Sequence, residues 1–181
     1  MDSPRTDLSF AIATARDVPA LLKLHAAVAG DLTGRYGPGP WSLPATYNEK
    51  PMLYDVSRSK FVRILIARDR RGIAATLRLQ TKKPWAIDTA YFSPVERPLY
   101  LTSMAVLPKL QRRGVGRRLL QEAEGAARAW PADAIRLDAF AGAAGAGPFY
   151  AKCAYREVGR VTYRKSPLMY FELVFGRSPG V

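Results

Sequence analysis

The residues with the clearest chemical pattern lie in a basic, glycine-containing turn, residues 111–117 (QRRGVGR). Gly114 and Gly116 have no Cβ, so a ligand can approach their backbone N–H groups closely. The apolar residues that follow have helical spacing, and the first N–H groups of a helix lack internal partners and favour an anion. The sequence therefore predicts a phosphate-binding turn at the start of a helix.

Two common phosphate-binding patterns do not fit this turn. A nucleoside-triphosphate P-loop needs Lys and Ser/Thr after its last glycine, but Arg117 and Arg118 follow Gly116. The dinucleotide fingerprint needs a third glycine at position 119, which is Leu119. A different phosphate ligand is therefore expected.

The turn resembles the Gln/Arg-x-x-Gly-x-Gly/Ala signature of the GCN5-related N-acetyltransferase superfamily. A second segment, residues 147–155 (GPFYAKCAY), is similar to the Phe-Tyr-x-Lys-Cys-Gly-Phe element of that family. Together the two motifs cover residues 100–160. The resemblance implies an α/β (α+β mixed-sheet) fold, a GNAT-like central mixed β-sheet flanked by helices, and acetyl transfer from acetyl-CoA to an amine.

The resemblance also assigns roles to residues. The turn would hold the pyrophosphate of acetyl-CoA, and the strand ending at residues 104–106 would bind the pantetheine arm where it splays from strand 134–140. The N–H of Ala105 would face the thioester oxygen. Tyr150 would be the general acid that protonates the thiolate, since a phenol is protonated at neutral pH. The expected cofactor-binding residues are Met104, Ala105, Val106, Gln111, Arg112, Arg113, Gly114, Val115, Gly116 and Arg117.

The chain departs from the family pattern at the general base. Many members carry a Glu just before the cofactor-binding strand segment, where this chain has Thr102 and Ser103. Neither hydroxyl is a base at neutral pH. The alternatives are a water held by these hydroxyls or a carboxylate from elsewhere, namely Asp88, Glu96 or Asp138.

The second motif also departs from the pattern. The family's Asn near this motif is replaced within residues 140–147 (FAGAAGAG), which removes one expected cofactor contact. Ala154 stands where the family has Gly, so a positive φ there would carry a small strain. Cys153 is expected to be a buried small hydrophobe.

The acceptor site is expected between two irregular aromatic segments, residues 34–57 and 84–97. Their composition favours a small amine with an apolar or planar body over a protein terminus. Asp55, Asp88 and Glu96 could neutralise its ammonium group. An antibiotic, a polyamine or an amino-acid-like metabolite would fit.

Apolar periodicity and turn residues predict strands that alternate with helices around a mixed sheet. His25 falls on the first helix and is expected at the surface or half-buried. The expected strands cover residues 10–15, 61–67, 73–79, 100–106, 134–140, 155–163 and 168–175, and the expected helices begin after Asp17 and cover 114–129 and 148–153.

Composition sets further limits. A chain of 181 residues with 48% hydrophobic residues predicts one domain, residues 1–181. No apolar run is long enough for a membrane span, and the polar start is not a secretory signal. The single cysteine suits a reducing cytoplasm, and no Cys/His cluster suggests a metal. A monomer or homodimer is expected.

The formal net charge of +13 has two explanations. Some of the basic residues would lie on a solvated, Arg-rich surface, and others would bind the phosphates of coenzyme A. Only residues 109–118 form a dense basic cluster, so no specific nucleic-acid binding is expected. Two other functions stay open: a non-catalytic acyl-CoA-binding or regulatory module on the same fold, and a basic nucleic-acid-binding protein.

Overall fold

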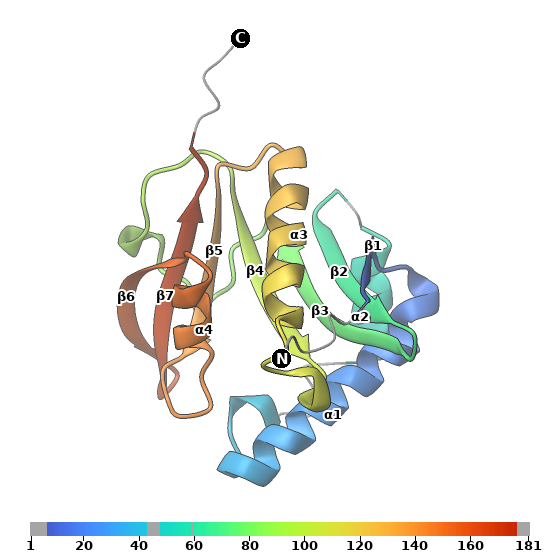
Figure 1. Ribbon diagram of the computed structural model, residues 1–181. Coiled ribbons are helices and arrows are strands. Elements are labelled where there is room, and N and C mark those ends of the chain that lie inside the picture. The colour runs from blue at the N-terminus through green and yellow to red at the C-terminus, as the bar shows by residue number, and fades with distance from the viewer. Residues whose placement is uncertain (1–6, 43–47, 59, 177–181) are drawn as a thin grey trace, which may run out of the picture. The chain divides into compact units, whose positions relative to one another are not determined.

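A computed structural model describes residues 7–42, 48–58 and 60–176 (Figure 1). Seven strands form one sheet in the order β1-β2-β3-β4-β5-β7-β6. The strands are β1 Ser9–Ile12, β2 Val62–Asp69, β3 Gly72–Gln80, β4 Pro98–Val106, β5 Ala134–Phe140, β6 Arg156–Tyr163 and β7 Ser166–Val174. The helices are α1 Val18–Tyr36, α2 Glu49–Val56, α3 Val115–Ala129 and α4 Gly147–Lys152. The predicted mixed α/β sheet is confirmed.

The chain forms two compact units. The first unit runs up to Arg78 and includes Ser103–Glu122, and the second comprises Leu79–Thr102 and the chain from Ala123 onwards. The boundaries fall inside β3, β4 and α3. That residues 1–181 form one domain stays a prediction.

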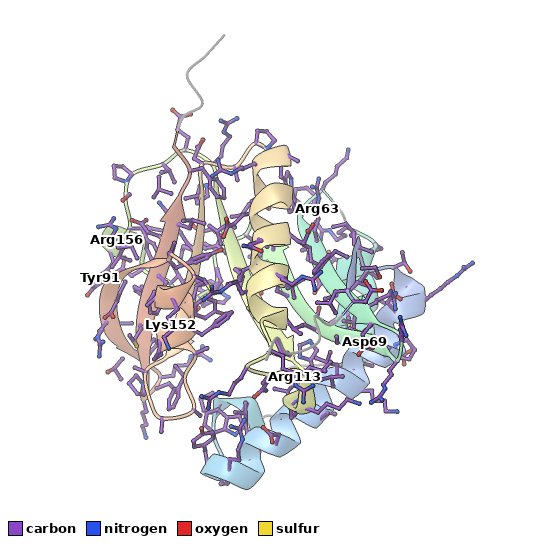
Figure 2. All side chains as sticks on the ribbon, viewed as in Figure 1. Arg63, Asp69, Tyr91, Arg113, Lys152 and Arg156 are labelled. Atoms are coloured by element: carbon purple, nitrogen blue, oxygen red, sulfur yellow. The ribbon has the colours of Figure 1, made fainter. Side chains whose placement is uncertain are left out.

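In the first unit, β1 runs antiparallel to β2, from the pair Ser9 and Arg68 to the pair Ile12 and Leu65. A two-residue turn connects β2 to β3. The Oδ1 atom of Asp69, labelled in Figure 2, accepts a hydrogen bond of 2.8 Å from the N–H of Arg71 in this turn. The turn holds the two strands as a hairpin.

Helices α1 and α2 contribute apolar side chains to the core of the first unit. Val18, Leu21 and Leu24 recur every three residues along α1, and all three are buried. They pack with Met52 of α2 and with apolar residues of the sheet. This periodicity explains why the segment is helical and which side of it faces the sheet.

The start of α1 follows Asp17, as predicted, but the Asp17 carboxylate does not cap that helix. Its oxygens accept hydrogen bonds from the Thr14 N–H at 2.8 Å and from the Arg68 guanidinium. Burial by itself raises the pKa of Asp17, yet these hydrogen bonds from Thr14 and Arg68 lower it overall. The residue therefore ties the start of α1 to β2.

The segment 34–57 is helical where the structure describes it. Helix α1 continues past Gly34, a 3-10 turn covers Pro40–Ser42, and α2 follows. Tyr36 packs edge-on against Trp41, with ring centroids 6.5 Å apart. The segment that the sequence marks as irregular is therefore largely helical in its described part, while residues 43–47 lie outside that part.

In the second unit, β5 pairs antiparallel with β7 along its whole length, and β7 pairs with β6 (Figure 1). Strand β4 runs parallel to β5 through three pairs, from Pro98 with Ala134 to Tyr100 with Arg136. Within the described residues of this unit, Leu101 and Thr102 of β4 have no partner on β5. The two strands therefore part after Tyr100, as the resemblance implies.

The irregular segment 84–97 is fastened to β7. The N–H of Asp88 donates to the Tyr170 hydroxyl at 3.1 Å, and that hydroxyl donates to the Ala86 carbonyl. Further along, Ser93 donates to Glu172 from its N–H at 3.0 Å and from its hydroxyl at 2.7 Å. Because Glu172 is only 1% exposed, these bonds satisfy a buried charge and fix the segment in place.

The described residues contain no helix that is both long and apolar enough to cross a membrane.

Candidate functional site

The predicted phosphate turn lies between β4 and α3. The Leu107 N–H donates to the Ala74 carbonyl at 2.9 Å, which ties the end of β4 to β3. The Gln111 side chain then donates from Nε2 to the Val106 carbonyl at 3.1 Å. Leu110 and Val115 are buried on either side of the exposed turn residues. The turn is thus tied to the sheet by hydrogen bonds at its β4 end and flanked on both sides by buried apolar side chains.

The backbone of the turn is bent by left-handed residues. Arg112 has φ 60° and Gly114 has φ 78°. Such residues can direct successive N–H groups to one side of a turn, where they bind anions. A Cβ added at Gly114 would meet no atom within 4 Å, so the space beside this residue is open to a ligand.

The side chains around the turn divide into two sets. Arg112, Arg113 and Arg117 are exposed, and Arg113 projects from the turn in Figure 2. Val115 and Gly116 are buried, so only their backbone could face a ligand. Guanidinium groups and helix-start N–H groups together are the donor set that a pyrophosphate requires. The turn fits the coenzyme A phosphates.

The strand before the turn carries a backbone irregularity. Ser103 has φ 53°, although it lies inside β4. Ala105, two residues on, is buried in the core of the first unit. The Thr102 hydroxyl is buried without a hydrogen-bond partner in the described structure, whereas Ser103 lines a cavity. Of the two hydroxyls suggested to hold a water, Ser103 is therefore one that borders such a space.

Tyr150, the predicted general acid, lies on α4 and is only 6% exposed. Its ring packs against Tyr155 and Phe171, with centroids 5.9 Å away in each case. Burial, together with the nearby Asp138 and Cys153, raises the pKa of Tyr150 well above its ordinary value. The phenol therefore stays protonated at any physiological pH, as a proton donor must.

The three carboxylates considered as base differ in their surroundings. Asp88 is exposed and accepts a hydrogen bond of 3.0 Å from the Ala90 N–H. Glu96 is exposed as well. Asp138 lies on β5, and burial raises its pKa. A raised pKa brings a carboxyl closer to the range in which it can accept a proton at neutral pH, so Asp138 stays a candidate for the base.

The other departure from the family motif has a structural consequence. Ala154 has φ 66°, which confirms that this position requires the left-handed region. An alanine here carries strain that glycine would not have. Cys153 beside it is partly buried and forms no disulfide within the described residues.

The first unit contains a cavity of about 60 Å³ beneath α1 and α2. Asp55 of α2 and Arg78 of β3 both line it, and they form an ion pair with N–O distances of 3.0 and 3.2 Å. Asp55 is 15% exposed, and burial raises its pKa, although Arg78 and Arg58 act in the opposite direction. The lining residues are Leu21, His25, Asn48, Pro51, Met52, Asp55, Ile64, Thr76, Leu77, Arg78 and Ser103.

The cavity draws on only one of the two segments expected to form the acceptor site. Residues 48–55 from the segment 34–57 contribute to it. Residues 94–97 of the other segment instead line a groove within the second unit, together with Arg128 and Phe175. Of the three carboxylates expected to neutralise an ammonium group, Asp55 is therefore the one in this cavity.

The prediction that His25 is exposed or half-buried is wrong. His25 is 6% exposed and lines the cavity, because it follows Leu24 on the buried side of α1. Burial lowers its pKa from 6.5 to about 4. The imidazole is therefore neutral at physiological pH.

We expect acid to destabilise the protein through His25. The folded-state pKa of about 4 lies below the ordinary 6.5, so the unfolded chain takes up the proton first as the pH falls. Above pH 6.5 His25 is neutral in both the folded and the unfolded chain, and the protein has its full stability. As the pH falls from 6.5 towards 4, protonation of the unfolded chain lowers the free energy of unfolding by about 3 kcal/mol. Urea unfolding at a series of pH values measures it.

The control is His25→Gln, which removes the only histidine of the chain. In this variant, the part of the pH dependence of the unfolding free energy that His25 causes between pH 4 and 6.5 should be absent. The carboxyl groups titrate alike in both proteins, so their contribution cancels in the comparison. An identical slope in the variant and the parent protein would contradict the assignment.

The described residues 7–42, 48–58 and 60–176 contain no group of three or more His, Cys, Asp or Glu side chains that could hold a metal ion.

Comparison with known proteins agrees with this geometry. The model of the acetyltransferase (GNAT) family matches residues 31–155, a range that contains both motifs. The chain therefore belongs to the acetyltransferase (GNAT) family, and it is an acetyl-CoA-dependent N-acetyltransferase. No curated protein matches the chain significantly.

Solved structures share the fold at low sequence identity. PaiA N-acetyltransferase from Thermoplasma acidophilum, in complex with coenzyme A, has 15% identity and a TM-score of 0.70, covering 91% of this chain and 98% of its own. Arabidopsis thaliana NAA60, in complex with a bisubstrate analogue, has 14% identity and a TM-score of 0.71, covering 95% and 100%. YncA from Salmonella typhimurium, a putative acetyltransferase with acetyl-CoA, has 14% identity and a TM-score of 0.68, covering 96% of each chain.

Proposed function

We propose that this enzyme acetylates the primary amine of a small molecule by direct attack on acetyl-CoA, with Tyr150 as the general acid. The observation that carries the proposal is the environment of Tyr150. Its phenol lies on the motif helix α4, and burial keeps it protonated. A positioned donor of this kind suits the departure of a thiolate.

The chemistry can be written for this chain's residues. The amine nitrogen forms a bond to the thioester carbonyl carbon, the C–S bond breaks, and the Tyr150 hydroxyl gives its proton to the departing sulfur. The N–H of Ala105 would stabilise the oxyanion. The proton that the amine loses would pass to Asp138, or to a water held at Ser103. The raised pKa of Asp138 supports the first of these proton acceptors, and the position of Ser103 on the cavity wall supports the second.

Residues 104–106 and 111–117 would bind the pantetheine arm and the phosphates. Support comes from the open space at Gly114, from the exposed arginines, and from the bound coenzyme in the structures of PaiA and YncA. The acceptor is proposed to be a small amine and not a macromolecule. A cytoplasmic location is part of the proposal, because a chain with a single cysteine suits a reducing compartment.

A two-step experiment tests this function. A thermal-shift screen with coenzyme A, acetyl-CoA and a short DNA duplex measures which ligand stabilises the folded protein. Thiol release from acetyl-CoA with a panel of small primary amines then measures turnover. Stabilisation by the coenzymes together with amine-dependent thiol release supports the proposal. Binding without release from any amine would contradict it, and sequence-selective DNA binding at physiological salt would indicate the nucleic-acid alternative.

A further inference from the structure

The cavity in the first unit is lined by one negative and one positive side chain. Asp55 and Arg78 face each other across two N–O contacts of 3.0 and 3.2 Å. The rest of the lining is mixed: it combines apolar residues such as Leu21, Met52 and Ile64 with the polar residues His25, Asn48, Thr76 and Ser103. A cavity of about 60 Å³ admits several water molecules, which is the space that a small polar head group needs.

The two charges are poorly satisfied by their surroundings. The Asp55 and Arg78 side chains are only 15% and 31% exposed, so both have lost much of their hydration. The Nε atom of Arg78 is buried and has no hydrogen-bond partner in the described structure. Partly dehydrated charges gain when a ligand supplies further hydrogen bonds.

The pair is neutral in itself, and the nearby Arg58 adds a positive charge that acts to lower the pKa of Asp55, against the effect of burial. His25 is uncharged at neutral pH because burial lowers its pKa to about 4. Arg58 is half-buried, and its guanidinium stacks on the rings of Tyr54 and Phe61 at 4.8 and 5.0 Å from their centroids. A ligand with a lone positive charge would gain from Asp55 but would be repelled by Arg78. A ligand that carries both charges would complement both side chains.

The cavity also adjoins the strand that would present the acetyl group. Ser103 lines it and directly precedes Met104, the first residue expected to bind the pantetheine arm. The left-handed backbone of Ser103 interrupts β4 at this point. An amine held in the cavity would therefore lie near residues 103–104 of β4, where the acetyl group is expected.

We propose that this cavity selects an acceptor that carries a carboxylate beside its amine, that is, an amino acid or a close analogue with a free carboxyl group. The Asp55 carboxylate would accept hydrogen bonds from the ammonium group, and the Arg78 guanidinium would donate to the carboxylate. The ion pair between Asp55 and Arg78 would be exchanged for these contacts on binding. The inference rests on the proposed function and adds the class of its acceptor.

The test uses matched pairs of compounds. The common L-amino acids are each compared with the corresponding α-carboxamide, which keeps the amine and side chain but removes the negative charge. Thiol release gives kcat/KM, and calorimetry with the coenzyme A-saturated protein gives affinity. For at least one pair we expect a preference of tenfold or more for the acid in both measurements. Equal use of acid and carboxamide in every pair would overturn the inference.

The variant Arg78→Gln isolates the carboxylate contact. It should lower kcat/KM for the preferred acid about tenfold or more and leave that of its carboxamide nearly unchanged, so the preference disappears. If Arg78 only stabilised the fold, both values would fall together and the preference would persist, which would also overturn the inference. Arg97→Gln is the control, since Arg97 pairs with Asp133 at 3.2 Å in the second unit and should not alter the preference.

The two proposals can fail separately. Acetylation of amines that lack a carboxylate, with no activity or binding for amino acids, would overturn the acceptor class and keep the acetyltransferase reaction. Amino-acid binding that depends on Arg78, with no thiol release from any amine, would overturn the proposed reaction and keep the binding site.

Discussion

Tyr150→Phe is expected to lower kcat for acetyl transfer by roughly 10²–10⁴-fold, the usual contribution of a positioned proton donor. Phenylalanine keeps the ring, so the packing against Tyr155 and Phe171 is retained and only the hydroxyl is lost. Affinity for acetyl-CoA should change little. Single-turnover thiol release, under conditions where the chemical step limits the rate, measures the effect.

Two controls separate proton donation from packing. A thioester whose leaving thiol is more acidic needs a proton less, so Tyr150→Phe should lose less rate with that substrate. A packing defect would instead penalise both thioesters equally. Tyr155→Phe is the matched variant, because the Tyr155 hydroxyl is also buried but has no hydrogen-bond partner in the described structure.

We expect Tyr155→Phe to keep kcat. If Tyr150→Phe kept it as well, Tyr150 would have no part in the mechanism, and the role carried over from the family motif would fail. If Tyr155→Phe alone lost activity, Tyr155 would become the proton donor.

Local patterns were sufficient to predict most of the fold. Leu119, Leu120, Ala123 and Ala127 stand at helical spacing, and all four are buried on α3. Pro108 marks the end of β4, which the structure places at Val106. These elements are governed by side-chain periodicity and by the missing N–H of proline, which a sequence displays directly. Most ends agree within two residues, but the first strand, expected to reach residue 15, ends at Ile12, and α2 was not among the expected helices.

The candidate site was predictable only where a compact motif encodes it. The phosphate turn and Tyr150 lie in short contiguous segments, and even the strained backbone of Ala154 follows from one departure in the motif. The wrong prediction for His25 arose because its burial depends on what packs over α1, namely α2 and the sheet. A histidine without a neighbouring motif gives no sign of this.

The cavity charges illustrate the same limit. Asp55 and Arg78 are 23 residues apart in the sequence, on α2 and β3, and no local pattern links them. The segments 34–57 and 84–97 have similar aromatic composition, yet only the first contributes to the cavity. Hydrogen bonds from Ser93 to Glu172 and from Asp88 to Tyr170 fix the second segment on β7 instead. Pairing between distant residues requires the fold.

The left-handed glycine of the phosphate turn should control coenzyme binding. Gly114→Ala is expected to raise the Kd for coenzyme A about tenfold and Gly114→Val about a hundredfold, equivalent to roughly 1.4 and 3 kcal/mol. A side chain at φ 78° is strained, and its Cβ would occupy the open space where a phosphate approaches the backbone. Calorimetric titration with coenzyme A, below the unfolding transition of each variant, measures the change.

The matched control for this loss of affinity is Gly72→Ala in the turn between β2 and β3. Gly72 also has a positive φ, 129°, and no atom would lie within 4 Å of an added Cβ. The strain is of the same kind, but nothing at this turn suggests a phosphate site, so Gly72→Ala should lower the Tm and keep the Kd. An unchanged Kd in both Gly114 variants would show that the pyrophosphate does not approach this backbone. An equal loss of affinity in Gly72→Ala would show that backbone strain, and not the phosphate contact, weakens binding.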